Sequence, residues 1–159
     1  MSGPDGREII LTMLGAGEFF GELSLVDSQP RSATVATMEP SQFAVMCKGD
    51  FKRVMAKSPQ MADHVMMGLA QRLREADKKI SSLALMDVYG RVARTLLQLA
   101  VKREGVLVVS DKLSQQDIAN MVGASREMVN RILKELEGSG YIKVESKNII
   151  INDQLPLSL

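Results

Sequence analysis

One face of a short helix predicted near the C-terminus carries the side chains that can read DNA bases. Arg126, Glu127 and Arg131 lie on this face together with Asn130 and Lys134. An arginine can donate two hydrogen bonds to O6 and N7 of guanine, and a glutamate can accept one from N4 of cytosine. Because an α-helix fits the major groove of B-form DNA, this pattern predicts sequence-specific DNA recognition.

The residues around this face predict the two helices of a helix-turn-helix. Ser114 and Asp117 have the spacing of a capping box at the start of the first helix. Gly123 supplies the turn, and Ser125 can cap the second helix. An exposed, salt-bridged face is the alternative, since Glu127 stands four residues before an arginine. That alternative explains the charges but not the turn and the caps.

A β-hairpin is expected after the second helix, over residues 141–151 with its turn at 146–148. Two helices followed by such a hairpin form a winged helix-turn-helix. Five residues of this region are expected to touch DNA phosphates rather than bases: Gln116, Ser125, Lys134, Lys143 and Lys147. Contacts of this kind fix the register of the protein on the duplex and make binding sensitive to salt.

An apolar seam runs along the long helix that is predicted over Pro59–Leu85. Its members alternate at spacings of four and three residues: Ala62, Met66, Leu69, Leu73, Ala76, Ile80 and Leu83. A period of 3.5 residues over about three heptads indicates a coiled coil. We expect a parallel homodimer through this helix. The alternative is that the seam packs against the β-rich part of its own chain.

The first 58 residues are expected to contain short β-strands. Runs with β-branched or apolar residues occur at 8–14, 34–38 and 42–47. Arg31 and Ser32 lie between these runs and combine a forked guanidinium donor with a hydroxyl group. Together with the backbone N–H groups of a turn, these side chains make a compact phosphate site.

Three separated motifs make the chain resemble the cAMP receptor protein family of bacterial transcription regulators, also called the Crp/Fnr family. In chain order they are Phe20-Gly21-Glu22-Leu23 with Arg31-Ser32-Ala33, Asp87-Val88-Tyr89-Gly90-Arg91-Val92-Ala93, and Gly123-Ala124-Ser125-Arg126-Glu127 with Arg131. The resemblance implies an α+β fold with a partial cyclic-nucleotide-binding β-roll, a long dimerisation helix and a C-terminal winged helix-turn-helix. The expected domains are 1–58, 59–86 and 87–159. The roll is expected to be partial because the strands that open it in the family have no counterpart here.

The resemblance also implies a ligand. Arg31 and Ser32 would hold a cyclic phosphate, and Gly21 and Glu22 would meet the ribose hydroxyl. Asp77 would face the base and accept a hydrogen bond from an exocyclic amino group. Its neighbour is an alanine, whereas cAMP-responsive members carry hydroxyl residues at this pair. The expected effector is therefore cAMP or another cyclic mono- or dinucleotide.

On the DNA side, the resemblance implies that Arg126, Glu127 and Arg131 read a TGTGA-like half-site in double-stranded DNA. The dimer would then bind an inverted repeat, and RNA polymerase is a candidate partner. Two alternatives stay open. One is a cyclic-nucleotide-binding module whose helix-turn-helix contacts proteins, and the other is a DNA-binding regulator that needs no ligand.

Composition narrows the classes of protein to which this chain can belong. The chain has 159 residues, of which 25% are charged, and its net charge is +1, so the case for DNA depends on where the charges fall. The single cysteine, Cys47, cannot hold an iron–sulfur cluster, and the single histidine, His64, is expected to be structural rather than a haem or metal ligand. The sequence contains neither a catalytic motif nor an apolar run of membrane length. We therefore expect a cytoplasmic protein that is not an enzyme.

Overall fold

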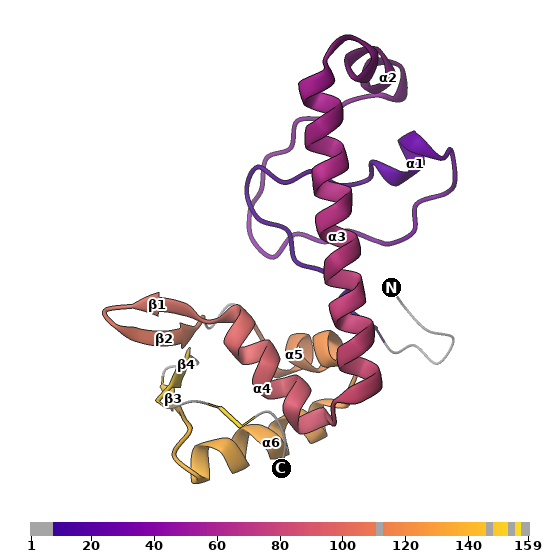
Figure 1. Ribbon diagram of the computed structural model, residues 1–159. Coiled ribbons are helices and arrows are strands. Elements are labelled where there is room, and N and C mark those ends of the chain that lie inside the picture. Colours follow the sequence, from indigo (N-terminus) through magenta and orange to yellow (C-terminus); the bar gives the residue numbers. More distant parts are fainter. Residues whose placement is uncertain (1–7, 111–112, 146–147, 153–154, 157–159) are drawn as a thin grey trace. The chain divides into compact units, whose positions relative to one another are not determined.

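The structure is a computed structural model that describes residues 8–110, 113–145, 148–152 and 155–156 (Figure 1). The chain forms two compact units. One unit comprises Met1–Thr12 together with Lys79–Leu159, and the other comprises Met13–Lys78. The boundary between them falls within the long helix α3 (Pro59–Leu85), whose bounds match the sequence prediction.

The unit that holds residues 79–159 is called the C-terminal unit below. Besides the end of α3, it contains the helices α4 (Val88–Leu99), α5 (Gln115–Val122) and α6 (Arg126–Gly138). Their starts are fixed by side-chain caps. Asp87 accepts a hydrogen bond from the backbone N–H of Gly90, 2.7 Å away. At α5, Ser114 accepts from the N–H of Asp117, whose carboxylate accepts in return from the N–H of Ser114. The predicted capping box is therefore confirmed.

Four short strands form one antiparallel sheet: β1 (Val101–Arg103), β2 (Val106–Val109), β3 (Ile142–Glu145) and β4 (Asn148–Ile151). Their order in the sheet is β1-β2-β4-β3. The hairpin β3–β4 is the predicted wing. Helix α4 ends at Leu99, and Val101 and Lys102 then pair with Val108 and Leu107 in the sheet.

The core of this unit lies between the three helices and the sheet. Leu96, Ile118, Leu136 and Ile142 are the largest side chains that are fully buried there. Burying a side chain of this size stabilises the fold by roughly 1.5–3 kcal/mol relative to leaving it in water. Because α4, α5, α6 and the wing all contribute to one cluster, the core fixes α6 against the other two helices and the sheet.

The unit of residues 13–78 contains α1 (Leu23–Val26), α2 (Lys48–Lys57) and the first part of α3. The strands predicted at 8–14, 34–38 and 42–47 are wrong. Residues 8–47 are all described and contain no strand, only a single bridge at Glu8. A β-prone run becomes a strand only when another strand satisfies its backbone groups.

Apolar side chains of these runs are exposed; Val45, for example, is 93% exposed. No closed roll forms among the described residues of this segment. The α+β class is nevertheless confirmed, since helices combine with an antiparallel sheet that is confined to the C-terminal unit.

Helix α3 presents two different faces. One face packs within its unit: Val65 is buried, and Gly68 lies so close to Phe19 that a Cβ atom there would come within 2.6 Å of the ring. The predicted seam runs beside this face. Its members Ala62 and Leu69 are half-buried, whereas Leu73 is 63% exposed and Ile80 is 64% exposed. These two positions are seven residues apart, so an apolar stripe is open to solvent along the helix.

Candidate functional site

The recognition helix α6 has one apolar and one polar face. Val129, Ile132, Leu133 and Leu136 are buried in the core. Arg126, Glu127, Arg131 and Lys134 are all exposed. The structure therefore brings the three predicted base-reading residues onto one accessible helical surface, together with Lys134.

The turn before α6 is held by a glycine and a serine. Gly123 has φ +66°, in the left-handed region that a residue with a Cβ atom enters only with strain. Ala119, which is fully buried, accepts a hydrogen bond from the N–H of Ala124 at 3.1 Å. Ser125 then caps α6 by accepting from the N–H of Met128 at 3.2 Å. This geometry confirms the turn that the sequence predicts.

Electrostatics keep Glu127 in its ionised form. A hydrogen bond from its own backbone N–H lowers the pKa of this carboxyl group, and the Ser125 hydroxyl and the charge of Arg126 lower it further. The first turn of a helix also favours a negative charge. Glu127 is therefore an acceptor, as contact with an amino group of a base requires.

The predicted phosphate contacts occupy α5, α6 and the wing. Gln116 is exposed on α5, and its amide donates to Asn120 Oδ1 at 2.8 Å. On the wing, the Nζ atom of Lys143 lies 2.5 Å from Glu145 Oε1, which raises the pKa of Lys143. Lys147 lies outside the described residues. Each of these two side chains has further N–H donors besides the one used here.

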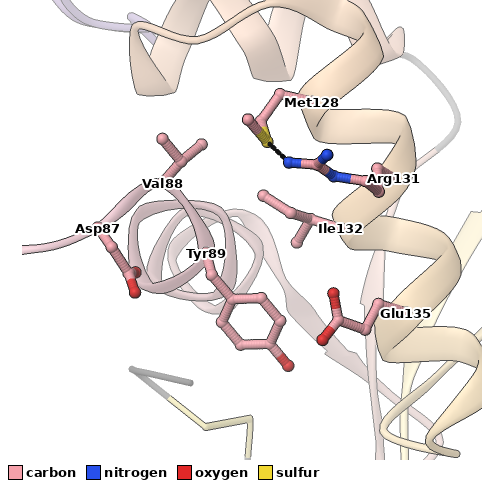
Figure 2. A pocket seen from close by; sticks show the side chains of 7 residues that line it. All are labelled: Asp87, Val88, Tyr89, Met128, Arg131, Ile132 and Glu135. Atoms are coloured by element: carbon pink, nitrogen blue, oxygen red, sulfur yellow. Dashed lines mark hydrogen bonds between the residues drawn. The ribbon is translucent and has the colours of Figure 1, made fainter.

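A surface hollow lies beside α6, and no sequence pattern predicts it. It has a volume of about 170 Å³ and lies between the start of α4 and α6. Figure 2 shows that the guanidinium group of Arg131 turns toward Met128 at this hollow, with Nη2 2.8 Å from Sδ. Arg131, which the sequence predicts to read a base, therefore has a sulfur partner on its own helix.

The predicted phosphate site is organised around Gly21. This glycine has φ +79°, and its carbonyl group accepts hydrogen bonds from the guanidinium of Arg31 and from Ser24 Oγ. A Cβ atom at this position would overlap the Arg31 guanidinium. Gly21 and Arg31 are therefore brought together as the sequence predicts, and the small size of glycine is what permits their contact.

Glu22 lies next to this pair and is the only charged side chain that is buried among the described residues, with 4% exposure. Its Oε1 atom is 2.6 Å from Nη1 of Arg72, which reaches across from α3. Arg72 also donates to the carbonyl of Phe19 and lies over the Phe19 ring, with 4.8 Å from Cζ to the ring centroid. The Oε2 atom of Glu22 is buried and has no hydrogen-bond partner among the described residues.

The other predicted ligand residues lie apart from this arrangement. Ser32 and Asp77 are both exposed, and no hydrogen bond between described residues joins either of them to Gly21, Glu22 or Arg31. Arg72 was not among the predicted site residues, although Gly68 in the interior of the same helix is a signal of close contact there.

Two observations concern other kinds of site. Among the residues that the structure describes, no group of three or more His, Cys, Asp and Glu side chains could hold a metal ion. Within the same part of the chain, no helix is both long enough and apolar enough to cross a membrane.

Comparisons with known proteins identify both parts of the sequence. Residues 90–157 match the Crp-like helix-turn-helix domain, and residues 1–58 match the cyclic nucleotide-binding domain. The chain is 38% identical to the CRP-like cAMP-activated global transcriptional regulator of Mycobacterium tuberculosis, over 94% of this chain and 69% of that protein. It is 39% identical to the cAMP-activated global transcriptional regulator CRP of Pasteurella multocida, over 92% of this chain and 72% of that protein.

Solved structures with the same fold include two regulators. The c-di-GMP-responsive global regulator CLP of Xanthomonas campestris has a TM-score of 0.74 and 25% identity, covering 96% of this chain and 78% of that one. A CRP/FNR-family transcriptional regulator from Thermus thermophilus has a TM-score of 0.71 and 26% identity, covering 98% and 78%.

Proposed function

The chain belongs to the Crp family of bacterial transcription regulators, and we propose that it binds an inverted-repeat DNA site as a homodimer under the control of a cyclic nucleotide. The observation that carries the proposal is the division of α6 into a buried apolar face and an exposed face with Arg126, Glu127 and Arg131. Such a helix can enter the major groove while its core stays intact.

Base recognition in this proposal depends on the three exposed side chains. Arg126 and Arg131 each donate in a fork to guanine, and the ionised Glu127 accepts from the amino group of cytosine. A half-site of the TGTGA type offers two guanines on one strand and the two cytosines paired with them on the other. The three residues therefore match the chemistry of such a half-site.

Phosphate contacts would hold the helix in this position. Gln116, Ser125 and Lys134 border the reading face on α5 and α6, and Lys143 and Lys147 belong to the wing. The ion pair between Lys143 and Glu145 is exposed and is worth little in water. Exchanging it for a phosphate contact therefore costs little, and each such contact adds to the salt dependence of binding.

Dimerisation is proposed through the open seam of α3. Leu73 and Ile80 are the most exposed of its large residues, and Met66 is 57% exposed. A second copy of the helix would cover this stripe in knobs-into-holes packing. The two-fold axis of the dimer would then present two recognition helices to half-sites about one helical turn apart.

The effector is proposed to bind beside Gly21, Glu22 and Arg31. Arg31 supplies positive charge for a cyclic phosphate, and Oε2 of Glu22, which is buried without a hydrogen-bond partner among the described residues, would accept from a ribose hydroxyl in the bound state. Ser32 would add a donor and Asp77 would meet the base. The relatives described above respond to different nucleotides, since those from M. tuberculosis and P. multocida are cAMP-activated and CLP responds to c-di-GMP. We propose cAMP as the first candidate because this chain shares more identical residues with the two cAMP-activated relatives, at 38% and 39%, than with CLP, at 25%.

Selection from a random duplex pool followed by sequencing tests the proposal without assuming a site. The folded protein would be used with cAMP, with c-di-GMP and with no nucleotide. Enrichment of an inverted repeat with half-site centres one helical turn apart would support DNA reading by a dimer. A folded protein that enriches no sequence under any of the three conditions would overturn the proposal and favour a protein-binding role for the helix-turn-helix.

A further inference from the structure

We propose that Met128 is an oxidation site that controls Arg131, an inference that rests on the proposed DNA-binding function. The two side chains stand three residues apart on α6 and therefore lie on the same side of the helix. Arg131 Nη2 is 2.8 Å from Met128 Sδ (Figure 2). The sulfur atom is thus the partner of a guanidinium group that is proposed to read guanine.

The sulfur atom lies where a small oxidant can reach it. Met128 is only half-buried, packed against the core on one side. On its other side it lines the hollow beside α4 and also a second one of about 280 Å³, which it shares with Ser125, Glu127 and Arg131. Arg131 is the only other residue that lines both hollows. An oxidant entering either hollow therefore meets this pair.

Hydrogen peroxide converts a thioether to a sulfoxide in one two-electron step. A sulfur lone pair attacks one peroxide oxygen and the O–O bond breaks. The transferred hydroxyl group gives its proton to the departing hydroxide, so the products are one sulfoxide and one water molecule. Sulfur is oxidised and peroxide is reduced, and no other co-reactant is needed.

The product changes the partner of Arg131. A thioether sulfur is a weak hydrogen-bond acceptor, whereas the sulfoxide oxygen is polar and accepts strongly. Hydrogen bonds between a charged donor and a strong acceptor are among the strongest that proteins make. The guanidinium would then be held on its own helix instead of reaching the base edge, and its guanine would no longer be read.

A second methionine–arginine contact in the same unit offers a matched control. Nη1 of Arg94 lies 3.4 Å from Sδ of Met86, before the start of α4. Arg94 lies on α4 and not on the exposed face of α6 that carries Arg126, Glu127 and Arg131. Oxidation at Met86 would therefore change an arginine contact of the same type without touching base recognition.

The experiment uses the full chain as wild type, Met128→Leu and Met86→Leu. Each protein is treated with graded hydrogen peroxide in the absence of DNA, and peptide mass spectrometry locates the sulfoxides. Fluorescence anisotropy then measures binding to a TGTGA inverted repeat and to a duplex in which the guanine assigned to Arg131 is replaced. Each sample is compared with its own untreated protein, and the thermal midpoint is recorded.

We expect oxidation of Met128 to weaken binding to the intact repeat about tenfold in wild type and in Met86→Leu, the size of one lost bidentate base contact. Binding to the replaced duplex should change little, so selectivity at that base pair is lost. Met128→Leu should keep its affinity under the same treatment. Met128→Gln, which places a polar oxygen there without peroxide, should reproduce the loss.

Three results would overturn the inference. The first is a Met128 that stays reduced at a dose that oxidises Met67, which is 70% exposed. The second is an equal loss of affinity in Met128→Leu and wild type, which would assign the loss to another methionine. The third is an equal loss for both duplexes with a lower thermal midpoint, which would indicate unfolding. A failure of untreated protein to select the repeat would instead refute the proposed function itself, before any oxidant is added.

Discussion

Arg72 on α3 and Glu22 beside the predicted phosphate site form an ion pair, with 2.6 Å between Nη1 and Oε1. The side chain of Glu22 is 5% exposed and that of Arg72 is 27% exposed. A nearly buried carboxylate needs a partner of opposite charge. Arg72 therefore orients Glu22, whose second oxygen, Oε2, is buried without a hydrogen-bond partner among the described residues.

Replacing Arg72 with alanine should destabilise the protein. Removing one partner of a fully buried ion pair costs about 3–5 kcal/mol, and the partial exposure of Arg72 reduces our expectation to about 2 kcal/mol. Urea unfolding measures this change. Arg74→Ala, an exposed position on the same helix, is the control and should be nearly neutral. The double variant with Glu22→Gln should recover part of the loss, and equal losses in the single and double variants would refute the account.

Introducing a charge on the α3 seam should separate the proposed dimer. Leu73→Glu would place two carboxylates against each other in a parallel coiled coil, where the unchanged chain would bury two leucines. Sedimentation equilibrium should then show a monomer at concentrations where wild type is dimeric. Arg74→Glu makes a larger change of charge at the adjacent position, off the seam, and should leave the dimer intact. Dissociation by both variants to the same extent would contradict a specific seam.

Replacing Arg126 and replacing Lys134 should weaken DNA binding in different ways. Arg126→Ala should cost about 1–3 kcal/mol and relax the preference at a single base pair, because it removes a contact to one base. Lys134→Ala should weaken binding to all sequences and reduce the slope of log affinity against log salt by about one. Anisotropy titrations over a salt series, on a panel of single-base replacements, distinguish the two. A uniform loss with Arg126→Ala would make it a phosphate contact.

Ionisation of Tyr89 should lower the free energy of unfolding at alkaline pH. Burial raises the pKa of its phenol group above the ordinary value of 10.0, and the charge of Glu135 adds to this shift. Since the folded pKa lies above the unfolded value, this stability is fully present below about pH 10 and is lost as pH rises through the folded pKa. Thermal midpoints between pH 8 and 11 should fall more steeply for wild type than for Tyr89→Phe. Parallel curves would show that Tyr89 does not contribute.

The sequence predicts the C-terminal unit well because its signals are local. The capping box at Ser114 and Asp117, the turn at Gly123 and the cap at Ser125 each involve residues within a few positions of one another. The heptad pattern likewise defines the long helix, whose bounds Pro59–Leu85 are confirmed. Short-range hydrogen bonds and periodic burial determine such elements before tertiary contacts form.

Long-range contacts explain what the sequence could not predict. The pair of Glu22 and Arg72 joins positions fifty residues apart. Similarly, Ile10 donates its N–H to the carbonyl of Asn120 at 3.0 Å, and its own carbonyl accepts from Lys79. The runs at 34–38 and 42–47 failed as strands for the same reason, since a strand depends on a partner that composition alone does not identify.

The most direct test of the central claim is the fluorescence anisotropy of a labelled duplex with an inverted TGTGA repeat, titrated with and without cAMP beside a scrambled duplex. The account predicts that cAMP tightens binding to the repeat and that the scrambled duplex binds more weakly in both conditions. Selective binding that ignores cAMP would keep DNA reading but reject cAMP as the effector. Equal affinity for the two duplexes, measured on a folded dimer with saturating cAMP, would contradict the account.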